Sequence, residues 1–196
     1  MPNSNTSIIM KGLKEFWIKN MVCNRCKSTV LQLFKNHGFE VESIELGQVS
    51  IKEGEKGNYI ELKSALKANG FEVIKDETEV LIEELKIKLI EKLEHQEVSN
   101  LSSFLPKTFN KSYAVISKIF SKHEGVTIEK YLIHLKIEKV KEYIQLGALN
   151  FSEIAYNLNY ASSSHLARQF KNITGISMTE YKKLQQWNRK TLDQIV

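Results

Sequence analysis

The sequence predicts an α+β protein, in which a small domain of mixed strands and helices is followed by an all-α domain. The spacing of apolar residues is one reason. Up to Ile74 these residues occur in short runs typical of strands and short helices, whereas from Thr78 onward they follow a helical period almost throughout. The second reason is that the C-terminal half repeats itself at an offset of 50 residues. Such self-similarity indicates a duplicated structural unit.

Composition is that of an ordinary globular protein, with 42% hydrophobic and 26% charged residues in a chain of 196. This length is enough for two small cores. We divide the chain into a flexible tail (1–11), a mixed domain (12–76) and a helical domain (77–196). No apolar run approaches the roughly 20 residues of a membrane span, and no signal-peptide core precedes Lys11. We therefore expect a cytoplasmic protein without a membrane partner.

The mixed domain shows an alternating order of strands and helices. A strand is predicted over 13–18 and a helix over 28–34, and two short strands flank a tight turn at Gly47. The remaining elements are a helix over 59–68, which ends at Gly70, and a strand over 71–74. The order is therefore βαββαβ, which predicts a ferredoxin-like fold.

The internal repeat predicts two helix-turn-helix units. Its paired positions are Ser112 and Ser162, Ile116 and Leu166, Lys118 and Arg168, Phe120 and Phe170, Gly125 and Gly175, and Tyr131 and Tyr181. In each copy the serine is a natural N-cap, the apolar pair four residues apart faces a core, and the glycine ends the helix. Shorter helices are predicted in front of the copies, over 101–108 and 151–158, each separated from its copy by a turn.

A further helix, predicted over 128–145, can hold the two units apart as a rigid spacer. Two recognition helices on one rigid body can enter successive major grooves, about 34 Å apart. The charge distribution agrees with a nucleic-acid partner. Residues 99–196 carry 14 Lys and Arg against 7 Asp and Glu, whereas residues 1–98 carry 14 against 16. The sequence therefore favours double-stranded DNA as the partner.

Residues 78–183 resemble the AraC-type DNA-binding domain, most clearly over Phe151–Tyr181. Family members usually have Gly-Phe where this chain has Asn159-Tyr160, and often Pro where it has Met178, and neither substitution changes the core. The first unit departs further, because Pro106 lies inside its leading helix. The resemblance implies a sequence-specific transcription regulator that works with RNA polymerase. Two readers in one chain suffice for a monomer to bind specifically, although such regulators often form homodimers through the other domain.

The resemblance also assigns contacts on the two recognition helices. The residues expected at base edges are Ala114, Ser117, Lys118, Ser163, Ser164, Ala167 and Arg168. Arg168 stands out because arginine can make a bidentate contact to guanine. The residues expected at phosphates are Lys122, Lys171, Lys182 and Lys183. The alternative is that Arg168 and Lys118 are ordinary solvated charges.

Two cysteines follow the first strand in the segment Met21-Val-Cys-Asn-Arg-Cys. Their position at a helix start predicts thiolates of lowered pKa, and two soft thiolates three positions apart can share one ion. With the βαββαβ order, residues 13–75 resemble the heavy-metal-associated domain of copper chaperones and metal-transporting ATPases, although Asn20 replaces the usual Gly. The resemblance implies that Cys23 and Cys26 hold Cu(I) or another soft ion such as Zn(II).

Three roles stay open for the cysteine pair: metal sensing, a dithiol/disulfide switch, and a structural domain with vestigial cysteines. Met21 is expected to fill the core beneath the loop, and the histidines show no ligand spacing. No phosphate-binding loop, nucleophile elbow or paired catalytic carboxylates appear, so an enzyme is not expected. The rival hypothesis is a metal-trafficking protein whose helical half binds a protein partner.

Overall fold

The computed structural model describes residues 13–52, 54, 56–95, 100–184, 189–190 and 195. The predicted tail, residues 1–11, lies outside the described residues. The chain forms two compact units, Met1–Glu83 and Glu84–Val196. The division falls inside a long helix, α3 (Glu77–Glu94), which therefore belongs partly to each unit.

The first unit is built on a four-stranded sheet. Its elements before α3 are β1 (Leu13–Lys19), α1 (Asn24–Asn36), β2 (Val41–Glu45), β3 (Gln48–Lys52), α2 (Tyr59–Ala68) and β4 (Glu72–Ile74). The strand order is β2-β3-β1-β4, and all neighbouring strands are antiparallel. The predicted succession of strands and helices is confirmed, and α1 begins earlier than predicted, directly after Cys23.

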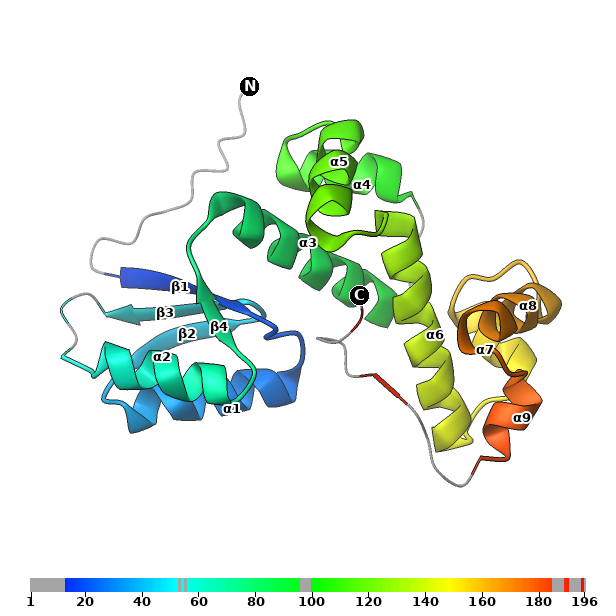
Figure 1. Ribbon diagram of the computed structural model, residues 1–196, viewed down its shortest axis with the longest axis horizontal. Helices are drawn as coiled ribbons and strands as arrows, with labels where there is room; N and C mark the ends of the chain where they lie inside the picture. Colours follow the sequence, from blue (N-terminus) through cyan, green and yellow to red (C-terminus); the bar gives the residue numbers. More distant parts are fainter. Residues whose placement is uncertain are drawn as a thin grey trace. The chain divides into compact units, whose positions relative to one another are not determined.

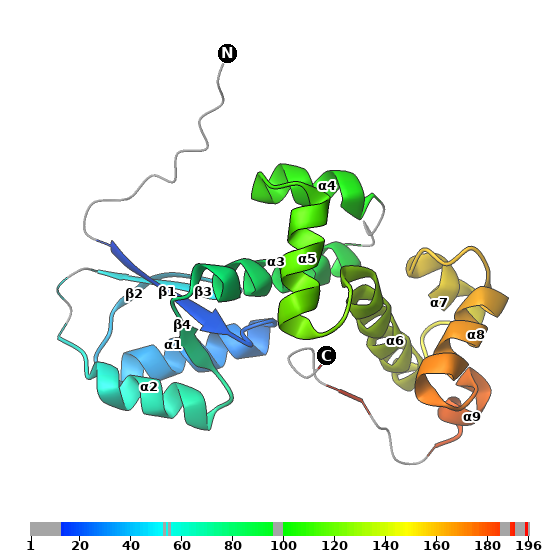
Figure 2. The ribbon, with the colours of Figure 1, turned by 45° about the horizontal axis from the view of Figure 1, so that its top comes forward.

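The core of this unit lies between the sheet and the two helices, which cover one face of the sheet (Figure 2). Phe16 is buried in this core, where its ring meets Phe34 of α1 edge to face, with 5.7 Å between ring centroids. Leu62 and Leu66 of α2 belong to the same cluster. The neighbouring Trp17 is half-buried and lies opposite Gln48 in the sheet register. Phe16 therefore faces the core, while its neighbour Trp17 does so less completely.

The second unit is helical throughout its described residues. After α3 come α4 (Leu101–Phe109), α5 (Tyr113–Glu124), α6 (Ile128–Leu146), α7 (Phe151–Asn157), α8 (Ser163–Thr174) and α9 (Met178–Lys182). Within this unit α6 lies between the α4–α5 pair and the α7–α8 pair (Figure 1). The predicted helix pairs and the spacer are present.

Helix α6 supplies much of the core of the second unit. Tyr131, Leu135, Val140 and Ile144 are buried along its length, and α5, α8 and α9 pack against it. A helix buried on this scale is held by tertiary packing rather than by its own propensity. This packing explains why α6 can hold the two helix pairs in a fixed arrangement. None of the helices in the described ranges combines the length and apolar character that a membrane span requires.

Candidate nucleic-acid interface

Helix α8 presents one face to the core and the other to solvent. The Ser162 side chain accepts the backbone N–H of His165 at 3.1 Å and so begins the helix. Gly175 ends it in the left-handed conformation, with φ of +81°. Leu166 and Phe170 are completely buried. The opposite face is therefore free to contact a ligand.

Helix α5 is built in the same way at the corresponding positions. The Ser112 side chain accepts the backbone N–H of Val115 at 3.4 Å, and Gly125 ends the helix with φ of +71°. Ile116 and Phe120 are completely buried. The sequence repeat is thus a repeat of caps, core residues and helix ends in three dimensions.

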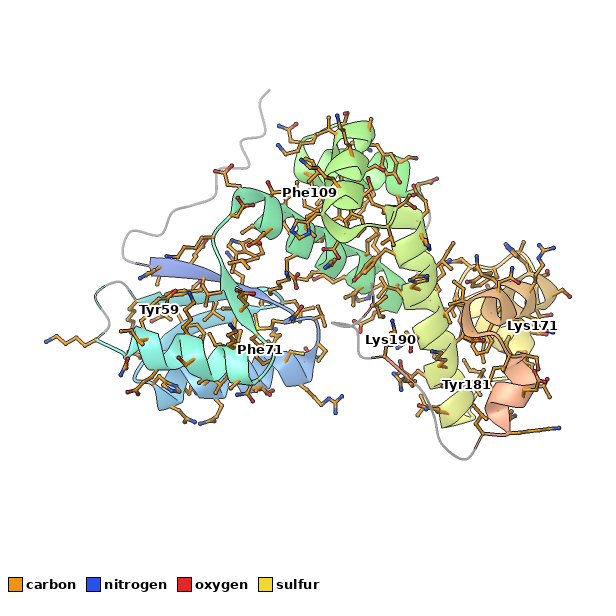
Figure 3. All side chains as sticks on the ribbon, viewed as in Figure 1. Tyr59, Phe71, Phe109, Lys171, Tyr181 and Lys190 are labelled. Carbon is orange, nitrogen blue, oxygen red and sulfur yellow. The ribbon has the colours of Figure 1, made fainter. Side chains whose placement is uncertain are left out.

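The repeat extends beyond the recognition helices to the aromatic pairs behind them. Phe120 packs edge to face on Tyr131, and Phe170 packs on Tyr181 in the same geometry, each pair with 5.5 Å between ring centroids. Figure 3 labels Tyr181, which lies where α9 meets α6. In both copies the aromatic pair joins the recognition helix to the helix that follows it. Truncating such a buried aromatic residue costs about 3 to 5 kcal/mol.

The residues expected at base edges lie on the outer faces of α5 and α8. Those that are exposed are Ala114, Lys118, Ser164, Ala167 and Arg168, and those that are half-buried are Ser117 and Ser163. Within the described part of the chain, neither Lys118 nor Arg168 has a carboxylate partner. A charge without an internal partner can meet DNA without first breaking an ion pair.

The residues expected at phosphates are also exposed. Lys122 lies in the last turn of α5 and Lys171 in the last turn of α8, while Lys182 and Lys183 end α9. Figure 3 labels Lys171 on α8. These lysines share the second unit with the recognition helices, so affinity and readout can come from one body.

Sequence reasoning missed the cluster around Tyr160, which lies in the turn between α7 and α8. Its hydroxyl donates a hydrogen bond to the side-chain oxygen of Gln169, and its ring meets the ring of the exposed His165 edge to face at 5.5 Å. The ammonium of Lys136, from α6, lies 5.0 Å from the ring centroid. Burial raises the pKa of Tyr160 to about 12, so the hydroxyl keeps its proton near neutral pH. The ring of Tyr160 thus supports the exposed side chain of His165. The position of His165 on the outer side of α8 is the signal that could have identified this cluster.

The turn before α8 explains why Asn159 can replace the usual glycine. Asn159 has a φ of +56°, a left-handed conformation that asparagine tolerates better than most residues. The other noted departure, Met178, is buried as the first residue of α9, directly after the N-cap Ser177. Proline is common at that first position because its missing N–H is not needed there. Both departures are therefore compatible with the unit.

The cysteine pair lies in the first unit, at the start of α1. Cys23 is the N-cap residue, and its sulfur accepts the backbone N–H of Cys26 at 3.4 Å. The two sulfurs lie 2.8 Å apart, joined by a thiol hydrogen bond, and both side chains are half-buried. Met21 is completely buried beneath the loop, as predicted.

The expectation of a lowered thiolate pKa is wrong for Cys26. Burial, followed by the hydrogen bond with Cys23, raises the pKa of this thiol to about 11. Desolvation thus outweighs the backbone hydrogen bonds that favour the thiolate. Among the described residues, no group of three or more His, Cys, Asp or Glu side chains could hold a metal. The pair therefore offers two sulfur ligands, without a third His, Cys, Asp or Glu ligand in the part of the chain that the structure describes.

Comparison with known proteins gives a family match within the second unit and a distant relative. Residues 105–184 match a family described as a helix-turn-helix domain. This match begins within α4 and continues through α9. Over 79 residues, 40% of this chain, the sequence is 25% identical to the Msm operon regulatory protein of Streptococcus mutans. The chain covers 28% of that relative's length, and no solved structure matches the chain significantly.

Proposed function

We propose that the chain is a sequence-specific transcription regulator of the AraC type that binds double-stranded DNA through α5 and α8. The observation that carries this proposal is the structural repeat. The two recognition helices have the same caps, an equivalent buried apolar pair and the same Phe–Tyr contact, and each turns small polar and basic side chains outward. The match to a helix-turn-helix family over residues 105–184 supports the same conclusion.

The division of labour between these side chains follows from their chemistry. Arg168 can bind guanine with two parallel hydrogen bonds, whereas Ala114 and Ala167 offer a methyl group to thymine. Serine hydroxyls at 163 and 164 can pair with several bases. The lysines at helix ends neutralise phosphates, which contributes affinity without sequence information. In this proposal the chain acts in the cytoplasm and is not an enzyme. RNA polymerase is its downstream partner.

The test is duplex binding by the full chain. A duplex selected from a random-sequence pool is titrated by fluorescence anisotropy at several salt concentrations, and log affinity is expected to fall linearly with log salt. The double variant Lys118→Ala/Arg168→Ala is expected to lose specific binding. Its matched control is Lys63→Ala/Lys67→Ala, which removes two positive charges from exposed positions of the first unit. Equal loss in both variants would show that general charge, rather than the recognition helices, accounts for binding.

We also propose that the first unit is a ferredoxin-like, heavy-metal-associated-like domain through which a soft metal regulates DNA binding. The strand order and the thiol pair at the start of α1 support this idea. Two soft sulfurs suit Cu(I), which accepts thiolate ligands readily. A closed zinc site needs about four ligands, so Zn(II) fits the described donor set less well. Binding of the ion would have to displace the Cys26 proton, whose pKa is raised.

The metal proposal has its own experiment, made on reduced full-length protein without oxygen. Cu(I) is measured by equilibrium dialysis and the same samples are titrated with the selected duplex, with Cys23→Ser/Cys26→Ser as control. One ion per chain, lost in the control, together with a changed duplex affinity supports metal sensing. A changed affinity on oxidation alone supports the dithiol/disulfide alternative. Copper binding without any duplex binding would favour the metal-trafficking alternative instead.

A further inference from the structure

Helix α3 carries a buried charged group at each end of one of its turns, and the boundary between the two units passes between them. Glu83 belongs to the first unit and Lys86 to the second, and both residues are buried. The two positions are three residues apart, which is nearly one helical turn. Glu83 contacts Asn20 of the first unit, and Lys86 contacts Glu124 of the second.

In the first unit, Glu83 holds the loop that leads to the cysteines. Its carboxylate accepts the backbone N–H of Asn20 at 2.8 Å. Asn20 has a left-handed backbone with φ of +69°, and its side-chain amide donates to the carbonyl of Gly70 at 2.9 Å. Three residues further on lies Cys23. The backbone that enters the cysteine loop is therefore hydrogen-bonded to the buried carboxylate of Glu83 in α3.

In the second unit, Lys86 holds the end of a recognition helix. Its ammonium lies 2.8 Å from the carboxylate of Glu124, and the two side chains are only 11% and 6% exposed. Glu124 is the last residue of α5, directly before Gly125. Breaking a buried ion pair leaves an uncompensated charge, so α3 and the end of α5 are held to a fixed relation.

We propose that the Glu83–Lys86 turn of α3 couples the conformation of the cysteine loop to the first helix-turn-helix unit, α4–α5. A displacement of the loop pulls on Glu83, and a displacement of α3 disturbs the Lys86–Glu124 pair. The two contacts share one helical turn, so neither changes without strain in the other. The functional meaning of the coupling rests on the proposed DNA-binding function, and the coupling itself does not depend on which agent acts at the cysteines.

The coupling can be tested from the second unit towards the first, without DNA. The readout is the rate at which iodoacetamide alkylates the thiols of reduced, metal-free, full-length protein, in which Cys23 and Cys26 are the two cysteines. Lys86→Met is expected to change this rate by about fivefold or more. The matched control is Lys88→Met, because Lys88 lies on the same helix and pairs with Glu91 of that helix at 2.8 Å.

A second substitution guards against simple unfolding by Lys86→Met. Glu124→Gln removes the charge of the same ion pair with little change of shape, and circular dichroism verifies the fold of each variant. It is expected to change the alkylation rate in the same direction as Lys86→Met. Adding Glu83→Gln to either variant is expected to change the rate less than the separate effects predict, because the contacts act in series. Rates equal to that of Lys88→Met in both folded variants would overturn the proposal.

The reciprocal experiment runs from the first unit to DNA. Glu83→Gln is expected to change affinity for the selected duplex by about fivefold, although Glu83 belongs to the unit without recognition helices. Glu84→Gln, one position along α3, is the matched control. Unchanged affinity in Glu83→Gln would count against the coupling. If the wild-type chain binds no duplex, the proposed function fails, while the alkylation rates still decide whether the coupling exists.

Discussion

The two helix-turn-helix units have the same apolar skeleton but differ in how polar contacts anchor them. Phe120 and Phe170 have equivalent places and equivalent tyrosine partners. The first helix-turn-helix unit, α4–α5, is held to α3 by the buried Lys86–Glu124 pair. The second helix-turn-helix unit, α7–α8, is instead held by local contacts of Tyr160, which join its turn to its recognition helix. Duplication thus preserved the core, while the polar contacts diverged.

The difference extends to the leading helices. In α7, Asn150 and Glu153 form a reciprocal capping box, with Glu153 accepting the Asn150 N–H at 2.7 Å and the Asn150 side chain accepting in return at 3.0 Å. Helix α4 has no side-chain cap and contains Pro106. We infer that α7–α8 is the better ordered of the two helix-turn-helix units. The α4–α5 unit is the one whose conformation depends on contacts with α3.

The largest expected effect tests the shared skeleton. Phe120→Ala and Phe170→Ala should each destabilise the second compact unit by about 3 to 5 kcal/mol, because each removes a fully buried ring and leaves a cavity. Chemical denaturation followed by circular dichroism measures the loss. Tyr156→Ala is the control, since this tyrosine of α7 is 81% exposed. A wild-type free energy of unfolding in either Phe variant would end the claim of equivalence.

The next effect tests the division between readers. Arg168→Ala should cost about 1 to 3 kcal/mol of specific binding and relax the preference at one base pair. Lys118→Ala is the equivalent change in the first helix-turn-helix unit. It should weaken binding with less loss of base preference, because lysine lacks the planar, bidentate guanidinium of arginine. Selection of binding sites by each variant measures both quantities. An unchanged preference in Arg168→Ala would remove that residue from the base contacts.

A smaller effect compares the two N-caps. Ser112→Ala and Ser162→Ala should each cost about 1 kcal/mol of stability. The Ser162 variant should lose more stability, because the hydroxyl oxygen of Ser162 lies 3.1 Å from the capped nitrogen, whereas that of Ser112 lies 3.4 Å away. Thermal unfolding of both variants provides the comparison. Ser164→Ala, an exposed serine of α8 that caps no helix end, is the control. The reverse order of losses would contradict this ranking of the caps.

The smallest effect concerns the loss of stability at acidic pH. It distinguishes the two helix-turn-helix units because their tyrosines have different hydrogen-bond partners. The Tyr113 hydroxyl donates to the Glu129 carboxylate, which lowers the pKa of Glu129, whereas Tyr160 donates to the amide of Gln169. A lowered carboxyl pKa in the folded state contributes stability above the ordinary Glu pKa, and that contribution is lost as pH falls through the lowered value. Tyr113→Phe should therefore flatten the acid side of the stability profile.

The measurement is the free energy of unfolding between about pH 6 and pH 3 in wild type, Tyr113→Phe and Tyr160→Phe. Tyr160→Phe should keep the wild-type slope, since its partner does not titrate. An unchanged slope in Tyr113→Phe would show that the acid sensitivity arises elsewhere.

Much of this architecture follows from local sequence alone. Ser112, Ser162, Gly125 and Gly175 mark the ends of the recognition helices because capping and the left-handed conformation depend on neighbours along the chain. The helical period assigned Phe120 and Phe170 to the core for the same reason. The exposed residues of α5 and α8 then follow as the opposite faces of those helices, so the candidate interface could be located from sequence.

The tertiary structure decided the properties that depend on residues distant in sequence. Local reasoning predicted an activated thiol at a helix start, but burial and the neighbouring sulfur raise the pKa of Cys26 instead. The contacts of Glu83 with Asn20 and of Lys86 with Glu124 join positions far apart in the chain. No periodicity or spacing encodes such contacts. Desolvation and ion pairing depend on what the fold brings together, and these terms determine how the cysteine loop and the recognition helices are held.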